Sequence, residues 1–256
     1  MIRKKNLAAV LLVCSFLLTG CGVRGEKEAY SSPNFSKQES SSEESSMKTS
    51  EDEALITDED GELIDYSSLS DGELAEMPEM DETVDPSRMV GYYYDNDYYL
   101  PFAGFGVLTD GDNWRLYNAY QVSEVTDFTE EEVEAIWNGE KSPNYLETTV
   151  CAVAYHFQTG SNIVISYINP KMFWMTGLSA KDYLEMIAEE SEGLTVQTTT
   201  YLGREYAVLD IPSDEDDSGR RVQFVTEKDG FLVSIVYTVQ GDRTLEGMAE
   251  HLVRIQ

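Results

Sequence analysis

Residues 222–239 read Val-Gln-Phe-Val-Thr-Glu-Lys-Asp-Gly-Phe-Leu-Val-Ser-Ile-Val-Tyr-Thr-Val, and this stretch decides the fold. It contains two runs rich in β-branched and aromatic residues, 222–226 and 231–239, on either side of the turn signal Lys228-Asp229-Gly230. Successive residues of a strand point to opposite faces, so Phe231, Val233, Ile235 and Tyr237 should share one face. The pattern predicts an antiparallel hairpin with one face more deeply buried than the other.

Three further pairs of β-rich runs lie N-terminal to this hairpin. They are 102–108 with 114–120, 150–157 with 162–168, and 195–201 with 205–211. Turn residues join the last two pairs, at 158–161 and at Leu202-Gly203-Arg204. Because hairpins in series build antiparallel sheets, we expect one antiparallel sheet of about six to eight strands.

Three helices are predicted from caps and from the spacing of apolar residues. Thr129 followed by Glu132 forms a capping box, and Ser179 begins a second helix. A third helix is expected from Arg243 to Arg254, where apolar residues recur at helical spacing (Leu245, Met248, Ala249, Leu252 and Val253). Helices placed between hairpins indicate an α+β domain.

The charge of the chain limits its partners. Its 256 residues include 18 Lys and Arg against 48 Asp and Glu, a net charge of −30. Phosphate contacts need Lys and Arg, so this balance excludes an ordinary nucleic-acid binder and argues against a broad patch for anionic lipid. The three cysteines contain no Cys-X-X-Cys pair, so they provide neither a disulfide framework nor a zinc knuckle.

The N-terminus carries a targeting pattern. Arg3, Lys4 and Lys5 precede an apolar run over 7–18, which is too short to span a bilayer as a helix. The run ends in Leu18-Thr19-Gly20-Cys21, which resembles the lipobox of bacterial lipoproteins. The resemblance implies diacylglycerol on the Cys21 sulfur and cleavage after Gly20, and two acyl chains anchor a protein stably. A plain signal peptide with an incidental cysteine and an uncleaved anchor helix are the alternatives.

The segment after the lipobox differs in composition from the rest. Residues 22–88 contain 20 acidic and 5 basic residues, with serine runs at 40–42 and 45–46. Large apolar residues are few, so the segment cannot bury enough surface to offset chain entropy. We therefore expect a lipoprotein signal peptide over 1–20, a disordered acidic Ser-rich tether over 21–88 and an α+β domain over 89–256.

The domain resembles the PsbP-like fold, which occurs in an extrinsic photosystem II subunit and in many bacterial lipoproteins. The residues that carry the resemblance are Gly104-Phe105-Gly106 leading to Trp114, Leu202-Gly203-Arg204-Glu205-Tyr206, Gln223, Lys228-Asp229-Gly230-Phe231 and the expected C-terminal helix. Family members often have a Pro/Glu-Gly-Trp turn before the tryptophan, and this chain has Thr109-Asp110-Gly111-Asp112-Asn113 instead. The resemblance implies a non-enzymatic binding or assembly role.

The chain contains few residues suited to catalysis or metal binding. Removal of the signal and lipidation of Cys21 would leave Cys151 as the one free thiol, in an apolar run where we expect it to be buried. His156, five residues later in the same strand, should point to the opposite face. Short acidic stretches at 58–62, 110–113 and 214–217 suggest either weak calcium sites or solvated turns, and the turn reading is preferred. We expect neither an enzyme nor a cofactor.

Two aromatic clusters remain as candidate binding surfaces. Five tyrosines lie between residues 92 and 99, and Met172-Phe173-Trp174-Met175 follows the expected strand over 162–168. Such residues supply contact area in interfaces, although they could also cover the edge of the domain or pack under the second helix. The hypothesis is that residues 172–175 form an exposed binding edge. The protein would be a lipoprotein at the extracytoplasmic face of the cell membrane, and its domain would bind a protein or cell-wall component. The alternative is an extracytoplasmic binding protein that senses a solute or an ion.

Overall fold

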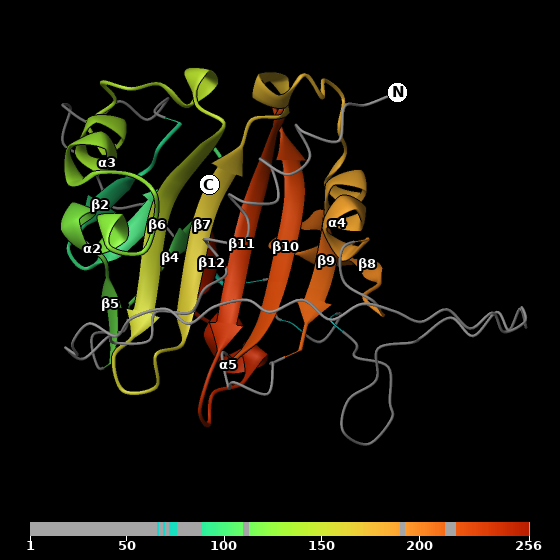
Figure 1. Cartoon of the computed structure of the whole chain (residues 1–256). Helices are drawn as coiled ribbons and strands as arrows, with labels where there is room; N and C mark the ends of the chain where they lie inside the picture. Colours follow the sequence, from blue (N-terminus) through green and yellow to red (C-terminus); the bar gives the residue numbers. More distant parts are fainter. Residues whose placement is uncertain are drawn as a thin grey trace, which may run out of the picture.

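The computed structural model describes residues 66, 69, 72–75, 89–109, 113–189, 193–212 and 219–255. Within them the chain forms an α+β domain with two β-sheets, as expected at the level of fold class. Figure 1 shows the larger sheet face-on, with helices on the side toward the viewer. The lipobox, most of the expected tether and the acidic stretches at 58–62 and 214–217 lie outside the described residues.

The larger sheet has seven strands, which agrees with the expected range. Its strands are β5 (Trp114–Leu116), β6 (Thr148–His156), β7 (Asn162–Ile168), β8 (Val196–Tyr201), β9 (Arg204–Ile211), β10 (Arg220–Lys228) and β11 (Phe231–Val239). They lie in the order β5-β6-β7-β11-β10-β9-β8, and every neighbouring pair is antiparallel. The hairpin predicted over 222–239 is confirmed as β10 and β11. Its turn residues Asp229 and Gly230 have φ angles of 50° and 86°, as a two-residue type I′ turn requires.

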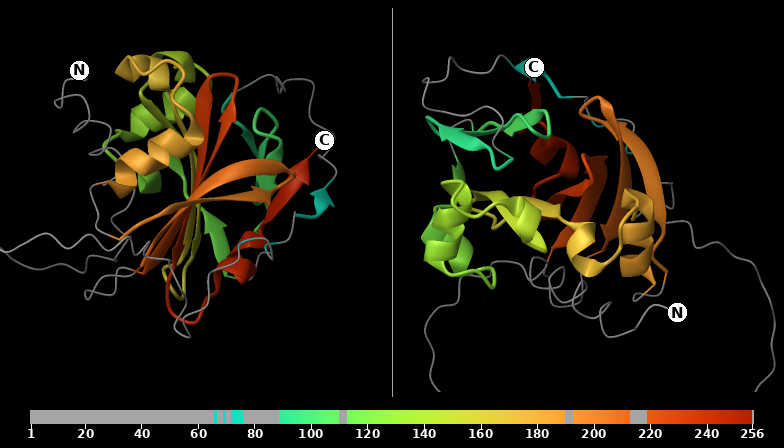
Figure 2. Two further views of the ribbon diagram at one scale, coloured as in Figure 1. Left: turned by 90° about the vertical axis from the view of Figure 1, so that its right-hand side faces the viewer. Right: turned by 90° about the horizontal axis from the view of Figure 1, so that it is seen from above.

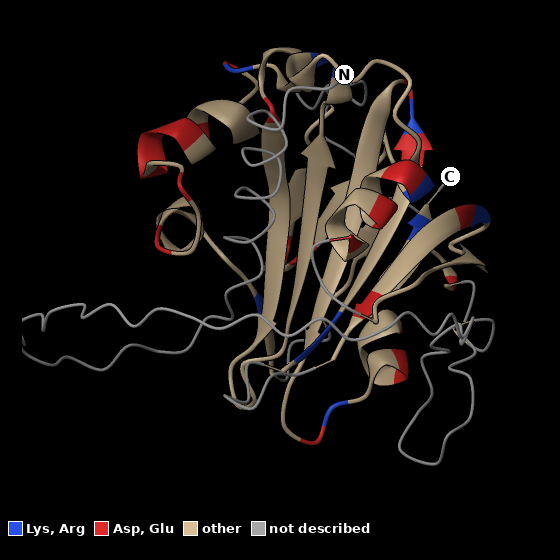
Figure 3. Cartoon of the chain, turned by 45° about the vertical axis from the view of Figure 1, so that its right-hand side comes forward, with Lys and Arg blue, Asp and Glu red and all other residues tan. Residues whose placement is uncertain are grey.

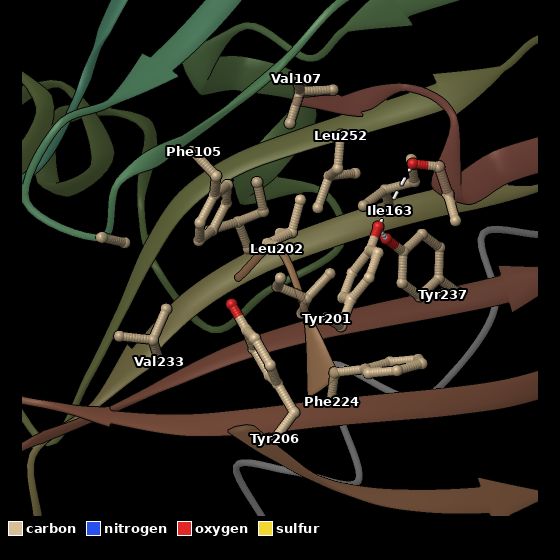
Figure 4. Packing of buried hydrophobic residues seen from close by; sticks show 14 of the residues in the cluster. Phe105, Val107, Ile163, Tyr201, Leu202, Tyr206, Phe224, Val233, Tyr237 and Leu252 are labelled. Atoms are coloured by element: carbon tan, nitrogen blue, oxygen red, sulfur yellow. Dashed lines mark hydrogen bonds between the residues drawn. The ribbon is translucent and has the colours of Figure 1, made fainter. Parts of the chain in front are cut away.

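The smaller sheet was not expected. It contains β1 (Leu74–Ala75), β2 (Tyr92–Tyr94), β3 (Asp97–Leu100), β4 (Phe105–Val107) and β12 (Leu252–Ile255), in the order β1-β12-β4-β3-β2. It packs against the face of the larger sheet that is turned away from the helices (Figure 2). The main core fills the space between the sheets. Phe105, Val107 and Leu252 of the smaller sheet meet Phe224 and Tyr237 of the larger one there (Figure 4).

Helices cover the other face of the larger sheet. They are α2 (Ala119–Ser123), α3 (Glu130–Trp137) and α4 (Ala180–Ala188). The fourth helix, α5 (Leu245–Ala249), lies near the lower end in Figure 1 and packs into the main core between the sheets. The α3 helix packs against β6, and α4 packs against β8, β9 and β10. Both predicted caps are present: Thr129 and Glu132 form the capping box of α3, and the Ser179 hydroxyl accepts a hydrogen bond from the Asp182 amide.

The described residues contain four α-helices rather than the expected three, since α2 was missed. The helix expected over 243–254 was too long: it ends at Ala249, and residues 252–255 form β12. Leucine and valine at positions 252 and 253 fit the helical spacing of α5, but their side chains are buried in the strand that pairs with β4. Tertiary pairing therefore overrides the local pattern at this end of the chain.

The expected pairing of 102–108 with 114–120 is also wrong. The first run supplies β4, which pairs with β3 and β12 in the smaller sheet. The second supplies β5, which pairs with β6 in the larger sheet, and then enters α2. The two runs are close in sequence, but they belong to different sheets.

The packed part of the chain begins before residue 89. Tyr66 and Leu69 are buried in the main core, and β1 runs parallel to β12. The Tyr66 hydroxyl donates to Asp210 Oδ2 over 2.5 Å, and Arg220 holds the same carboxylate with Nε and Nη2. The sequence did not indicate these contacts, because single apolar residues in an acid-rich segment produce no periodic signal. We call the described residues of this segment, 66, 69 and 72–75, the strap.

Candidate functional site

The loop that follows β7 presents the most exposed aromatic side chain of the described residues. It begins with Asn169 as the cap of a short 3₁₀ helix, η3 (Pro170–Phe173), and proline occupies the first helical position. Trp174 ends this helix in the left-handed conformation, with φ 62° and ψ 25°. Its side chain is 87% exposed. A non-glycine residue in this conformation costs about 1–2 kcal/mol, so the loop holds the indole in solvent at a conformational cost.

A second exposed aromatic ring lies on the neighbouring turn. This turn is the 3₁₀ helix η2 (Pro143–Tyr145), and Tyr145 is 80% exposed. Figure 1 shows the two short helices next to each other at the upper end of the larger sheet, η2 in yellow-green and η3 in gold. Together with Met172, which is 38% exposed, Tyr145 and Trp174 form what we call the aromatic edge.

Asn169 joins the two turns. Its backbone amide donates to the Glu147 carbonyl over 2.9 Å, and its side-chain amide donates to the Asn144 carbonyl over 3.1 Å. Its Oδ1 accepts from the Lys171 amide, which caps η3. Asn169 is itself 3% exposed, so these bonds are shielded from water. The aromatic edge is therefore mounted on two turns that one buried side chain holds together.

The four residues expected to form an exposed edge do not behave alike. Met172 and Trp174 are exposed, but Phe173 is 7% exposed and packs with Tyr183 and Leu184 under α4. Met175 is half-buried against the same cluster. A turn of 3₁₀ helix directs neighbouring side chains to different sides, which a sequence run cannot show. Phe173 and Met175 thus anchor the loop, while Met172 and Trp174 project from it.

Tyr145 was missed in the sequence. The only available signal was Ser142-Pro143-Asn144, a turn sequence with Ser142 as cap. Its position beside η3 depends on the pairing of β6 with β7, which brings Thr148 opposite Ile168.

The tyrosine cluster at 92–99 is mainly structural. Its residues form the hairpin of β2 and β3, in which Tyr92 stacks on Tyr99 at a ring distance of 5.6 Å. Tyr98 is fully buried and accepts a hydrogen bond from the Gly91 amide. Tyr93 packs on Trp137 of α3. Tyr94 alone among the five has half of its surface exposed.

Charge on the domain is unevenly distributed. Figure 3 shows acidic segments on the helices and few charges along the strands of the larger sheet. The cation on the edge loop itself is Lys171, whose side chain passes Gly230 in the β10–β11 turn. Lys228, next to that turn, lies over the ring of Phe102 and forms an ion pair with Asp229 over 3.3 Å.

Cys151 does not have the environment of a nucleophile. It is fully buried at a β-bulge of β6, and burial among apolar groups raises the pKa of its thiol well above the ordinary range. The bulge also corrects an expectation. It shifts the strand by one residue, so Cys151 and His156 both face the main core and not opposite sides.

The two histidines are held by structural contacts. His156 Nδ1 is 2.9 Å from the Thr159 hydroxyl, and Arg243 Nη2 contacts its Nε2. His251 Nδ1 donates to the Leu108 carbonyl over 2.8 Å, and its ring packs on Trp114. Across the described ranges, no three His, Cys, Asp or Glu side chains are grouped to hold a metal ion.

No family model matches this chain, and neither a curated protein nor a solved structure matches it. Among the described helices, none has the length and apolar character needed to cross a bilayer.

Proposed function

We propose that this protein is a lipid-anchored bacterial lipoprotein whose domain binds a protein partner, without catalysis, through the aromatic edge. The observation that carries the proposal is Trp174, whose indole is 87% exposed and is held in a left-handed conformation. Folding gains little from such a side chain, because it buries almost no apolar surface. Tryptophan and tyrosine are the residues most enriched at the energetic centres of protein interfaces.

The rigidity of the edge supports this role. Binding costs less entropy when the contact residues are already ordered, and Asn169 fixes the two turns that carry Tyr145 and Trp174. The adjoining Lys171 favours a partner with acidic groups near its apolar contact surface. Cys151 is buried with a raised pKa, and each histidine is occupied by structural contacts, which supports a role without catalysis.

The lipobox at residues 18–21 supports membrane attachment through diacylglycerol on Cys21, at the extracytoplasmic face of the cell membrane. Residues 22–65 would then act as a spacer between the membrane and the strap. A flexible chain of this length spans about 35–40 Å root-mean-square, and its like charges would extend it further. The domain would therefore stand away from an anionic membrane surface, with the aromatic edge free to meet a partner.

We also propose that the domain belongs to the PsbP-like group. The hairpin turns at Leu202-Gly203 and Asp229-Gly230, and the helix α4 between hairpins, fit that resemblance. The C-terminal helix fits less well, since α5 has five residues and is followed by a strand.

The test is recovery of a partner from the cell surface by the full chain, with exposed residues changed on and off the edge. The edge variant is Met172→Ala with Trp174→Ala, which leaves the buried Phe173 in place. The matched control is Tyr120→Ala, since Tyr120 is 54% exposed on α2. We expect at least tenfold lower recovery with the edge variant only, and equal recovery with all three chains would refute the proposal. A Cys21→Ser chain that still incorporates a fatty-acid label would refute the lipid anchor.

A second candidate, solute binding, is favoured by two polar atoms on the helix-side face of the larger sheet. Ser166 Oγ and Gln223 Oε1 are buried and have no hydrogen-bond partner among the described residues. Buried polar atoms normally have partners, so a bound solute could supply them. A thermal-shift screen with small polar solutes tests this candidate, and a stabilisation that Gln223→Leu abolishes would support it.

A further inference from the structure

We infer that β8 is a self-association edge, through which two copies of this chain join their larger sheets. The strand is the outermost one of that sheet, beyond β9, and no other described strand pairs with its outer side (Figure 1). A free strand edge presents a row of backbone donors and acceptors to any strand that can pair with it.

The strand lacks the usual protection of an edge. Charged residues make up 26% of the chain, but Val196-Gln197-Thr198-Thr199-Thr200-Tyr201 contains no charge and no proline. All six residues pair with β9 without a register shift, so no bulge twists the edge away. The opposite edge of the sheet differs: β5 spans three residues and has Arg115 at its centre. One edge is thus short and charged, and the other is long, regular and neutral.

Both ends of β8 are fixed by packing. Val196 contacts the apolar cluster under α4, and Tyr201 is fully buried in the main core on the other face. Between them, Thr198 and Thr200 are exposed. The strand is therefore fixed at both ends while Thr198 and Thr200 in its middle remain accessible to an added strand.

The sequence of β8 fits a second copy of itself. Two antiparallel edges related by a two-fold axis normal to the sheet keep their equivalent faces on the same side. With the axis at Thr199, this residue lies opposite Thr199 of the second copy, and Thr198 lies opposite Thr200 of the second copy. Cross-strand threonine pairs stabilise antiparallel sheets, and no like charges would face each other across the seam.

The association should be weak in solution and stronger on a surface. Six residues of edge bury far less than a standard interface, and the acidic domains repel each other at low salt. Copies attached to one membrane would meet at a much higher effective concentration. The inference does not depend on the aromatic edge, which lies on different loops.

The experiment uses a chain that begins at Gly22, which retains every described residue. Light scattering and sedimentation should show a monomer–dimer equilibrium across about two orders of magnitude in concentration. Thr198→Lys with Thr200→Lys should weaken the dimer about tenfold, because like charges then face each other. These substitutions lower the net negative charge, so a general charge effect would strengthen association. Circular dichroism checks that the variant folds.

Cysteine cross-linking tests the register, with Cys21 absent and Cys151 buried. Thr199→Cys should give a disulfide-linked dimer on mild oxidation, and Thr176→Cys, at an exposed threonine outside β8, should not. A monomer at all concentrations, a dimer unaffected by the lysines, or equal cross-linking at positions 176 and 199 would each overturn the inference. The lysine variant should recover the partner of the aromatic edge as well as the parent chain does, so failure of one proposal is distinguishable from failure of the other.

Discussion

Replacing Tyr66 tests whether the strap contributes to the folded domain. In Tyr66→Phe the ring stays on Phe224, where the two ring centres are 5.9 Å apart and nearly perpendicular, but the 2.5 Å hydrogen bond to Asp210 is lost. A hydrogen bond to a charged group contributes about 1.5–3 kcal/mol. Because Arg220 still holds the carboxylate, we expect the lower end, a loss of about 1.5 kcal/mol.

Tyr66→Ala removes the ring as well. Deleting a buried aromatic side chain costs about 3–5 kcal/mol, so this variant should lose about 4 kcal/mol unless the strap detaches as a unit first. The matched control is Tyr145→Phe, which removes the hydroxyl of a residue that is 80% exposed and should shift stability by less than about 0.5 kcal/mol.

The assay is urea unfolding of the chain from Gly22, followed by circular dichroism and tryptophan fluorescence. A double-mutant cycle of Tyr66→Phe with Asp210→Asn should give a coupling energy of about 1 kcal/mol. If Tyr66→Phe and Tyr66→Ala both unfold like the parent chain and the coupling is zero, the strap does not pack on the domain and the reasoning is wrong.

Four further positions give predictions. Trp174→Gly should raise the free energy of unfolding by about 1 kcal/mol, because glycine adopts the left-handed conformation without strain. Phe173→Ala should lower the free energy of unfolding by about 3 kcal/mol through loss of packing under α4. Urea unfolding measures both effects. Burial raises the pKa of Tyr237 above its ordinary value of about 10. The folded state thus favours the protonated phenol. Its contribution to the free energy of unfolding is present below about pH 10 and is lost as the pH rises further. Tyr237→Phe should therefore reduce the fall in the free energy of unfolding at alkaline pH. Cys151 should not react with a thiol reagent at neutral pH until the chain is unfolded, since its thiol is buried and protonated.

The features predicted correctly are those that local chemistry determines. Asp229-Gly230 requires positive φ angles and closes a hairpin, and Thr129 with Glu132 caps α3 whatever lies around them. Six strands of the larger sheet come from three hairpins that the sequence predicts, β6 with β7, β8 with β9 and β10 with β11. In contrast, residues 252–255 fit a helix as well as a strand, and only their pairing with β4 decides between them.

The candidate site was only half visible in the sequence for a similar reason. The run 172–175 identified the loop, but the 3₁₀ turn separates its members into Phe173, which is buried, and Trp174, which is exposed. Tyr145 lies at the site because β6 pairs with β7 and so brings its turn next to η3. A short stretch of sequence does not show which strands pair. The strap was hidden by composition, since its few apolar residues lie among many acids.

The strap also has a mechanical consequence. Tyr66 is hydrogen-bonded to Asp210, whose carboxylate pairs with Arg220 at the start of β10. The aromatic edge lies beyond the other end of β10, about 27 Å away at 3.4 Å per residue. In a chain anchored at Cys21 with a partner on the aromatic edge, tension would run lengthwise along the strands. The strands would resist it in shear, with many ladder hydrogen bonds strained at once. The strap is held by one buried tyrosine and a two-residue strand, so it would detach from the domain at a lower force than the sheet. Its residues would then add to the length of the spacer before the core was loaded.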